Sequence, residues 1–443
     1  MSSQKFRLMT NGIFGSAHLH SYRQQLAGHK ADVTHAVERM GPVDAAKKLA
    51  PVLPKRAIDA KYLRQAFDAL TRTDGRGAGP NRISPKELEG QEIWNLCHAT
   101  RDLVINGWYS PGPTRIEQIP KKARGLSKAK MREIELQNIE DKLLDRGAKD
   151  VYGPVLENLL LDTTFGSRSK TSWEDALGYA KAYSENCGAV WWVQNDIQAA
   201  FDNVDTRKLF DALEDILEDE AAVDHIRLLV DRGQQRGILT GSPLSPLLLD
   251  VFLHTVLDTP WRANSRTPPL IRLVDDLLIP CQSRSQADEV FDRLESVLSQ
   301  HDLVLKYPRS KSVLDISNIS CEWLGASATL KRGRVVFSLT DEKRVGIDTG
   351  CTQPNDQLKR TEVLGILESL GCCYSQDLEE WLLDLIAQRN QLQPGRWRVT
   401  QAEARKNLHR SARRWQKTLD TAMGKMTIPQ VDVGIDLIKT SNE

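Results

Sequence analysis

The stretch LIRLVDDLLI, residues 270–279, decides the fold class, because two adjacent carboxylates interrupt an otherwise apolar run. Its flanks predict two short buried strands that fold back on each other about Asp275 and Asp276. Two interpretations of this pair stay open. Aspartate is common in turns, so both acids could simply face water. Alternatively, the turn presents them beside another acid and a cation holds the group together, because like charges at short range otherwise repel.

A partner acid follows a second predicted strand. The run AVWWV, residues 189–193, predicts a buried strand, and Asp196 comes shortly after it. The end of a core strand holds a side chain rigidly, as a functional site requires. Asp196 and Asp275 could therefore hold two Mg²⁺ ions ~3.5–4 Å apart, with Asp276 assisting. Such a pair would activate a 3′-hydroxyl for in-line displacement of pyrophosphate.

Length and composition restrict the class of protein. The chain has 443 residues, of which 40% are hydrophobic and 27% charged, and its formal net charge is +1. These values exclude a disordered chain, a collagen and a coiled-coil rod, and they predict about three structural units. No apolar run approaches the ~18 residues of a membrane span, and no secretory signal is visible. With seven irregularly spaced cysteines, we expect free thiols, a cytoplasmic location and no membrane partner.

Apolar patterning divides the chain into segments. Residues 186–330 alternate short apolar runs with helical patterns, which predicts an α+β core. Helices are expected there at 205–217, with Asp205 as its cap, at 243–253 and at 287–298. The flanking ranges 1–60, 86–185 and 340–443 look mainly helical, and 74–85 is a loop rich in glycine and proline. Between residues 396 and 417, eight basic residues accompany the single acid Glu403, which predicts a basic helix face.

The ordered motifs resemble those of bacterial reverse transcriptases of the group II intron-like lineage. Four segments are similar to the family's palm motifs and occur in the family order: WVQNDIQAAFDNV, RGILTGSPLSPLLLDVFL, IRLVDDLLI, and LVLKYPRSKSVL followed by CEWLGA. Upstream segments resemble the motifs that precede the palm: GRGAGPNRISPKEL, YSPGPTRIEQIPKK, MREIELQNIEDKLL and FGSRSKTSWEDAL. The resemblance covers residues 74–330.

What the resemblance implies is an α+β right-hand polymerase. The expected parts are an N-terminal helical extension, fingers, a palm whose antiparallel sheet carries packed helices and the catalytic acids, and a helical thumb. Their expected ranges are 1–70, 71–185, 186–335 and 336–443.

The resemblance also implies residue roles. Asp196, Asp275 and Asp276 match the metal-binding acids, and Lys311 matches the catalytic lysine near the leaving pyrophosphate. The positions that match nucleotide-binding residues are Lys122, Arg132, Arg168, Phe201, Thr240 and Gly241. The positions expected to contact nucleic acid are Trp323, Gly325, Arg405, Arg410, Arg413 and Arg414. Phe201 matches the residue that excludes a ribose 2′-hydroxyl, although an aromatic residue after a strand is more often part of the core.

Four positions depart from the family pattern. The family glutamine is Thr240 here, and the proline before it is Leu239. The tyrosine before the paired acids is Leu273, and the asparagine after S-P-L-L-x is Asp250. Thr240 and Leu273 replace residues that touch nucleotide or primer, so nucleotide affinity or template use could differ from that of relatives.

The implied activity is that of an RNA-directed DNA polymerase. It would use Mg²⁺, or Mn²⁺ as a substitute, to add deoxynucleotides to a 3′ end on an RNA template. Two alternatives stay open: DNA synthesis without an external template, and an RNA-binding maturase-like or structural subunit. No endonuclease motif follows the thumb-sized segment, and free-standing relatives include anti-phage defence enzymes. An associated non-coding RNA and a homo-oligomer are therefore further expectations.

Overall fold

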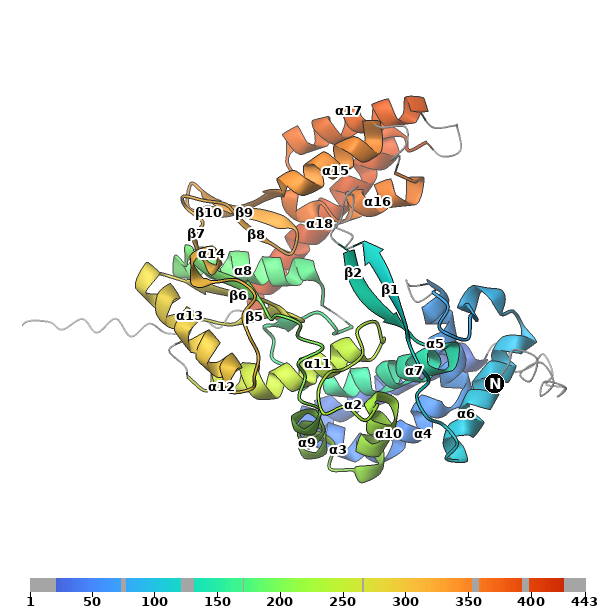
Figure 1. Ribbon diagram of the computed structural model, residues 1–443. Helices are drawn as coiled ribbons and strands as arrows, with labels where there is room; N and C mark the ends of the chain where they lie inside the picture. The colour runs from blue at the N-terminus through green and yellow to red at the C-terminus, as the bar shows by residue number, and fades with distance from the viewer. Residues whose placement is uncertain are drawn as a thin grey trace, which may run out of the picture.

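The computed structural model describes residues 21–72, 77–120, 131–169, 171–264, 267–352, 358–392 and 398–425. Figure 1 shows a helical bundle at the top, a sheet with packed helices at the left, and a second group of helices at the lower right. A two-stranded hairpin lies between the bundle and the lower helices (Figure 1). The α+β class predicted from the sequence is confirmed.

The lower-right helices surround α7, whose residues Leu143 and Val151 are fully buried in the largest hydrophobic core. Glycine and proline separate two of them: Gly41, with a φ of 84°, ends α2, and Pro42 begins α3, where its missing N–H is not needed. The helical elements are η2 (Ser21–Gln24), α2 (Gln25–Met40), α3 (Pro42–Leu49), η3 (Ala50–Val52), α4 (Leu53–Ile58), α5 (Ala60–Arg72), η4 (Pro85–Glu87), α6 (Gln91–Ile105) and α7 (Ile139–Leu156).

The hairpin between the two helical groups consists of β1 (Arg115–Pro120) and β2 (Met131–Leu136), which pair antiparallel. The prediction of helix and loop for residues 86–185 is wrong here. Ile116 is 64% exposed, and charged residues alternate along both strands. No buried apolar face therefore marked these segments as strands in the sequence.

A five-stranded sheet occupies the left of the molecule, in the order β3-β5-β6-β4-β7. Its strands are β3 (Thr164–Phe165), β4 (Trp191–Asp196), β5 (Ile271–Leu273), β6 (Asp276–Cys281) and β7 (Val313–Asp315). All neighbours are antiparallel except β3 and β5, which run parallel. The predicted palm-like sheet is present, but it is mixed and not purely antiparallel.

Helices cover both faces of this sheet. Val193 and Ile279 pack with α9, α11 and α13 in the largest core, whereas Trp192 and Leu278 pack with α8 in a second core. Adjacent residues of β4 thus enter different cores, as the two-residue period of a strand requires. The predicted cap is confirmed, since the Asp205 carboxylate accepts two N–H bonds at the start of α9. The helices are α8 (Trp173–Cys187), α9 (Thr206–Leu217), α10 (Glu220–Val230), α11 (Ser245–Leu253), the π-helical turn η5 (His254–Asp258), α12 (Thr259–Arg262), α13 (Arg284–Ser299) and α14 (Arg309–Ser312).

A small sheet and a helical bundle follow. The sheet has the order β10-β9-β8, with strands β8 (Cys321–Trp323), β9 (Ala326–Lys331) and β10 (Arg334–Leu339). The bundle consists of α15 (Asp341–Thr352), α16 (Arg360–Glu368), η7 (Gly371–Cys373), α17 (Gln376–Leu392) and α18 (Gln401–Lys425). Leu367, Ile386 and Leu408 belong to its own core. Helix α18 also packs along α8, which joins the bundle to the five-stranded sheet.

All seven cysteines are free thiols, as expected, and six of them are buried. Within the described ranges, no helix combines the length and the apolar character that crossing a membrane requires.

Candidate active site

Two acids that are distant in sequence meet where β4 and the β5–β6 hairpin end. Asp196 is the last residue of β4 and pairs antiparallel with Asp276, the first residue of β6. The N–H of Ile197 donates to the carbonyl oxygen of Asp275 at 3.1 Å. Burial raises the pKa of the Asp275 carboxyl, and the negative charge of Asp196 raises it further. The structure therefore brings Asp196 and Asp275 together, and their role as metal-binding acids stays a prediction.

The turn that carries Asp275 is strained. Leu273 pairs with Asp276, so Val274 and Asp275 form the two-residue connection of the hairpin. Val274 has a φ of 61°, which a β-branched residue rarely adopts and which costs about 1–2 kcal/mol. Gly166 supports this turn closely: a Cβ atom at Gly166 would lie 2.8 Å from Cγ2 of Val274. Backbone strain of this kind persists only where the surrounding structure enforces it, and it is found most often at functional sites.

A lysine that the sequence analysis missed compensates the acids. The Lys306 ammonium group donates to the Asp196 carboxylate, and its backbone N–H donates to the Asp196 carbonyl at 2.9 Å. Burial opposes the charge of Lys306, but the hydrogen bond and charge of Asp196 outweigh it and raise the pKa of the ammonium group. Lys306 lies in the stretch LVLKYPRSK, where the motif directed attention to Lys311. The presence of two lysines there was the only available signal.

The three predicted acids do not form one compact set of ligands. Among the residues that the structure describes, no group of three or more His, Cys, Asp and Glu side chains is arranged to hold a metal ion. Asp196 and Asp275 interact directly, and Asp276 joins them through the backbone pairing of its strand. The side chains of Asp196, Asp275 and Lys306 thus interact with one another in the site.

Comparison with known proteins identifies the segment that contains this site. Residues 119–328 match the family described as "Reverse transcriptase (RNA-dependent DNA polymerase)". The chain is 30% identical over 319 residues to the group II intron-encoded protein LtrA of Lactococcus lactis subsp. cremoris, a match that covers 63% of this chain and 51% of LtrA. The chain spans about half the length of LtrA.

Other proteins are similar to this chain at lower sequence identity. The chain is 27% identical over 182 residues to an uncharacterized 91 kDa protein in the cob intron of Schizosaccharomyces pombe, covering 39% of this chain and 21% of that protein. Among solved structures, telomerase from Candida albicans aligns with 72% of this chain and 61% of its own, at 13% identity and a TM-score of 0.43. Apo telomerase from Candida tropicalis aligns with 74% of this chain and 64% of its own, at 12% identity and a TM-score of 0.39.

The loop of the G-S-P motif lies against the β1–β2 hairpin. The carbonyl oxygen of Thr240 accepts the N–H of Glu135 in β2 at 2.9 Å. Gly241 has a φ of 112°, and a Cβ atom there would lie 2.9 Å from the Glu135 carbonyl oxygen, so only glycine fits. Ser242 donates to the buried Asp145 of α7 at 2.6 Å. The predicted nucleotide-binding residues Thr240 and Gly241 thus sit where this loop meets the hairpin.

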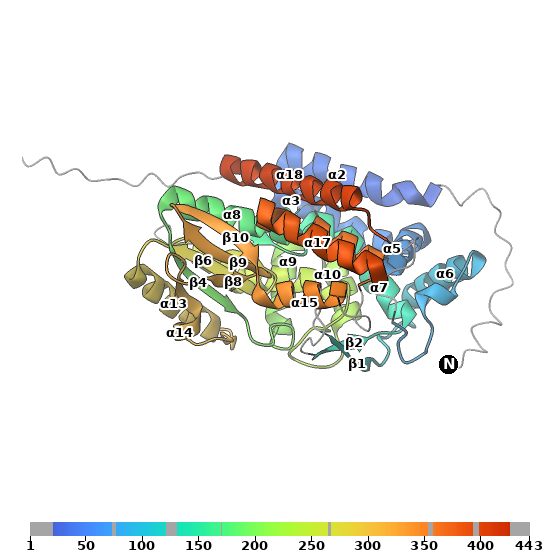
Figure 2. The ribbon, with the colours of Figure 1, turned by 90° about the horizontal axis from the view of Figure 1, so that it is seen from above.

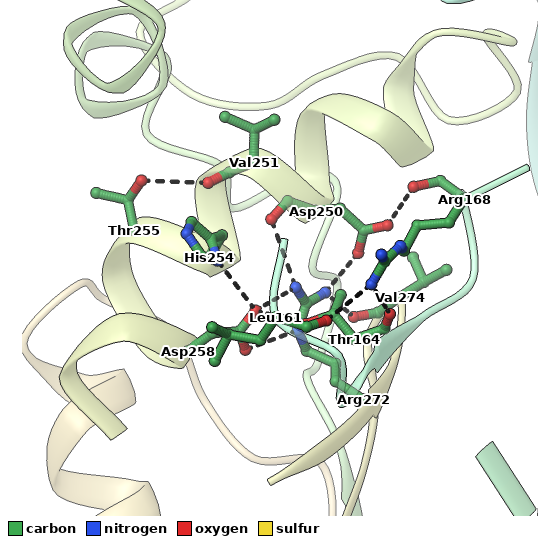
Figure 3. Close-up of polar contacts among 11 residues, drawn as sticks. Leu161, Thr164, Arg168, Asp250, Val251, His254, Thr255, Asp258, Arg272 and Val274 are labelled. Atoms are coloured by element: carbon green, nitrogen blue, oxygen red, sulfur yellow. Dashed lines mark hydrogen bonds and ion pairs between the residues drawn. The ribbon is translucent and has the colours of Figure 1, made fainter. Parts of the chain in front are cut away.

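The other predicted nucleotide contacts are placed differently. Phe201 is half-buried against the largest core, and its carbonyl oxygen accepts the N–H of Ile238 at 2.9 Å. Figure 3 shows the Arg168 guanidinium turned toward its own loop, where it donates to the carbonyl oxygens of Leu161 and Thr164 at 2.9 and 3.3 Å. Lys122 lies outside the described residues, as does the side chain of Arg132. Lys311 is exposed on α14.

The motif CEWLGA is placed in a core and a turn. Trp323 is 2% exposed and packs in the core between the small sheet and α8, so its predicted contact with nucleic acid is wrong for this structure. Its size and apolar ring favour burial over an exposed stacking position. Gly325, with a φ of 73°, lies in the turn between β8 and β9 next to Lys343, which donates to its carbonyl oxygen. The backbone of this turn stays a predicted contact.

The basic residues of α18 divide into two groups. Arg405 forms an ion pair with Glu379 of α17, and Arg414 forms one with Glu174 of α8. Both were predicted to contact nucleic acid, and in the structure each pairs with an acid of a neighbouring helix while staying about half exposed. Arg410 and Arg413 are exposed, as are Lys406 and Lys417. Within the described residues, none of these four side chains pairs with an acid.

Proposed function

We propose that this chain is an RNA-directed DNA polymerase that adds deoxynucleotides to a 3′ end. The observation that carries the proposal is the pairing of Asp196 with the Asp275 turn at one end of the palm-like sheet, within the segment that matches the reverse transcriptase family. In the proposed reaction the 3′-hydroxyl oxygen forms a bond to the α-phosphorus while the bond to pyrophosphate breaks. Residues 71–185, 186–335 and 336–443 would act as fingers, palm and thumb.

A divalent cation fits the donor set of the site. Mg²⁺ prefers oxygen ligands and is usually held by one or two carboxylates together with substrate phosphates and water. Asp196 and Asp275 supply two carboxylates that repel each other, and a cation between them would relieve that repulsion. Bound there, Mg²⁺ would polarise phosphoryl oxygens and favour ionisation of the 3′-hydroxyl. Lys306 would release the Asp196 carboxylate to the metal or stay as an additional positive charge.

The experiment is primer extension with defined RNA and DNA templates. Purified protein is incubated with Mg²⁺, a 5′-labelled DNA primer and the four dNTPs, and the products are sequenced. The proposal predicts DNA complementary to the RNA template. Products of the same sequence on every template would instead support synthesis without an external template, and the absence of any product with Mg²⁺ or Mn²⁺ would contradict the polymerase assignment.

A second proposal concerns the basic stripe, defined as Lys406, Arg410, Arg413 and Lys417 of α18. Their spacing of four, three and four residues places them on one side of the helix. Ala404, Leu408 and Ser411 are buried on the opposite side, which packs against the rest of the bundle. Figure 2 shows α18 along the edge of the molecule opposite the β1–β2 hairpin. We propose that the basic stripe binds the phosphate backbone of an associated RNA outside the active site.

A further inference from the structure

The catalytic turn is connected to a buried charge network centred on Arg272. This residue is the middle residue of β5, and its side chain is completely buried. Asp250 of α11 and Asp258 of η5 are buried beside it, with side chains 0% and 3% exposed. Figure 3 shows both carboxylates directed at the guanidinium group from two consecutive helical segments. Buried charges of this kind require partners for every polar atom.

Every N–H of the Arg272 guanidinium group has an acceptor. Nε and Nη2 donate to the two carboxylate oxygens of Asp258 at 3.0 and 2.6 Å. Nη1 and Nη2 donate to Oδ1 and the carbonyl oxygen of Asp250 at 2.5 and 3.4 Å. The remaining Nη1 bond reaches the carbonyl oxygen of Val274 at 2.8 Å. The guanidinium has five N–H groups, so its orientation is fully specified, and one of its bonds ends on the strained turn.

The same network holds the segment that packs against the other side of the turn. Ser167 donates to the second carboxylate oxygen of Asp250, and Thr164 donates to Asp258 at 3.1 Å. Strand β3 pairs with β5, with Thr164 opposite Arg272. Gly166, between these residues, is the glycine that contacts Val274. The network therefore fixes the turn from the carbonyl side of Val274 and also fixes the loop that covers its side chain.

We propose that Arg272, held by Asp250 and Asp258, is a positioning residue that keeps the Val274 turn in its strained form and thereby holds Asp275 beside Asp196. The predicted effect of Arg272 on catalysis rests on the proposed polymerase function. Its predicted effect on the conformation of the turn does not. Without the bond from Arg272, a valine in this position relaxes toward negative φ and carries Asp275 out of place. Asp250, where the family pattern has asparagine, acts as the link between the turn and Ser167.

The test variant is Arg272→Lys. Lysine keeps the positive charge but offers three N–H donors from a single atom, so it cannot serve all five acceptors. Amide exchange of residues 274–277 should accelerate while residues 191–195 of β4 stay protected. The Mg²⁺ concentration for half-maximal extension should rise, and kcat should fall about 10²-fold with little change in KM for dNTP. The matched control is Arg389→Lys, another fully buried arginine, which donates to the Leu358 carbonyl in the thumb bundle. It should leave the Mg²⁺ response unchanged.

A rescue variant separates positioning from general stability. Glycine adopts a positive φ without strain, so Val274→Gly in the Arg272→Lys background should recover about tenfold of the lost rate. If Arg272→Lys does not fold, Asp258→Asn replaces one acceptor oxygen and should shift exchange and Mg²⁺ response in the same direction. Unchanged exchange of residues 274–277 in the folded variant, or no rescue by glycine, would overturn the proposal. Faster exchange in a protein that never extends primers would reject the polymerase function and keep the positioning role.

Discussion

At the scale of single residues, Lys306 is the neutralising partner of the acid pair. Replacing it by methionine removes the ammonium group from Asp196 and leaves two neighbouring carboxylates without that charge. Because the Lys306 side chain is 36% exposed, solvent screening limits the loss in unfolding free energy to about 1 kcal/mol or less. The increase in melting temperature on adding Mg²⁺ should be larger in Lys306→Met than in the wild type. Thermal unfolding with and without Mg²⁺ measures both effects.

Lys311→Met is the matched comparison for this experiment. Lys311 lies five positions further along the same segment and is exposed, and it makes no described contact with Asp196. Its replacement should leave the Mg²⁺-dependent increase in melting temperature at the wild-type value. If Lys311→Met and Lys306→Met change the Mg²⁺ response equally, the specific pairing of Lys306 with Asp196 has no role in it.

His225 makes the stability of the fold depend on pH. It is buried beside Tyr152, whose hydroxyl lies 3.2 Å from Nδ1, and burial lowers the pKa of the imidazole to about 4. In the unfolded chain the pKa is near 6.5, so the unfolded state takes up a proton first as the pH falls. The contribution of His225 to stability is present above pH ~6.5 and is lost as the pH falls toward ~4, by about 3 kcal/mol in total.

The variant His225→Phe should reduce this dependence. Urea unfolding at pH 7 and at pH 4.5 gives the change in unfolding free energy for each protein. The wild type should lose more stability between the two pH values than the variant, by up to about 3 kcal/mol. Equal losses in both proteins would show that His225 does not remain neutral in the folded state.

At the scale of elements, the close approach of β3 to the β5–β6 hairpin depends on Gly166. Alanine there must fit a Cβ atom 2.8 Å from Val274 Cγ2 at a φ of 117°. Overpacking and backbone strain together should cost about 2–4 kcal/mol of unfolding free energy, and primer extension should fall with the displaced turn. Gly188→Ala is the control, because its φ is also positive, at 63°, but no atom lies within 4 Å. It should cost only about 1 kcal/mol, as measured by urea unfolding.

The basic stripe of α18 is tested by the salt dependence of RNA binding. Each phosphate contact contributes about 0.7–0.9 to the slope of log affinity against log salt concentration. Replacing the four stripe residues by glutamine should lower this slope by up to about 3 for a structured RNA. A matched double variant, Arg405→Gln with Arg414→Gln, removes two cations that already pair with Glu379 and Glu174. An equal loss of slope in this double variant would mean that the two groups of cations do not differ in RNA binding.

At the scale of the whole molecule, the sequence predicted elements whose signal is local. The cap of α9, the buried helix α11 and the hairpin around Asp275 each follow from a few neighbouring residues. The hairpin β1–β2 was missed because most of its apolar residues are exposed or only half-buried and charged residues lie between them. The order of strands in the sheet could not be predicted either, because the parallel pairing of β3 with β5 joins segments that are distant in sequence.

The candidate site was predictable in its acids and not in its surroundings. Two adjacent carboxylates within an apolar run are unusual, and so is a third at the end of a predicted strand. Both features can be recognised from the sequence alone. The contact of Lys306 with Asp196 and the burial of Trp323 both depend on how distant segments pack together. The sequence does not show that packing. The same holds for Arg272, whose partners Asp250 and Asp258 become meaningful only when α11 and β5 are placed side by side.

The most direct test of the account is RNA-templated extension by Asp275→Asn, with Asp202→Asn as its control. Asp202 is an exposed acid six residues after Asp196 and takes no part in the proposed site. The account predicts that Asp275→Asn loses about 10³-fold or more of the Mg²⁺-dependent rate while it binds the primer–template as tightly as the wild type. Asp202→Asn should retain the wild-type rate. Extension by Asp275→Asn at a rate similar to that of Asp202→Asn would contradict the central claim that the acid pair carries the chemistry.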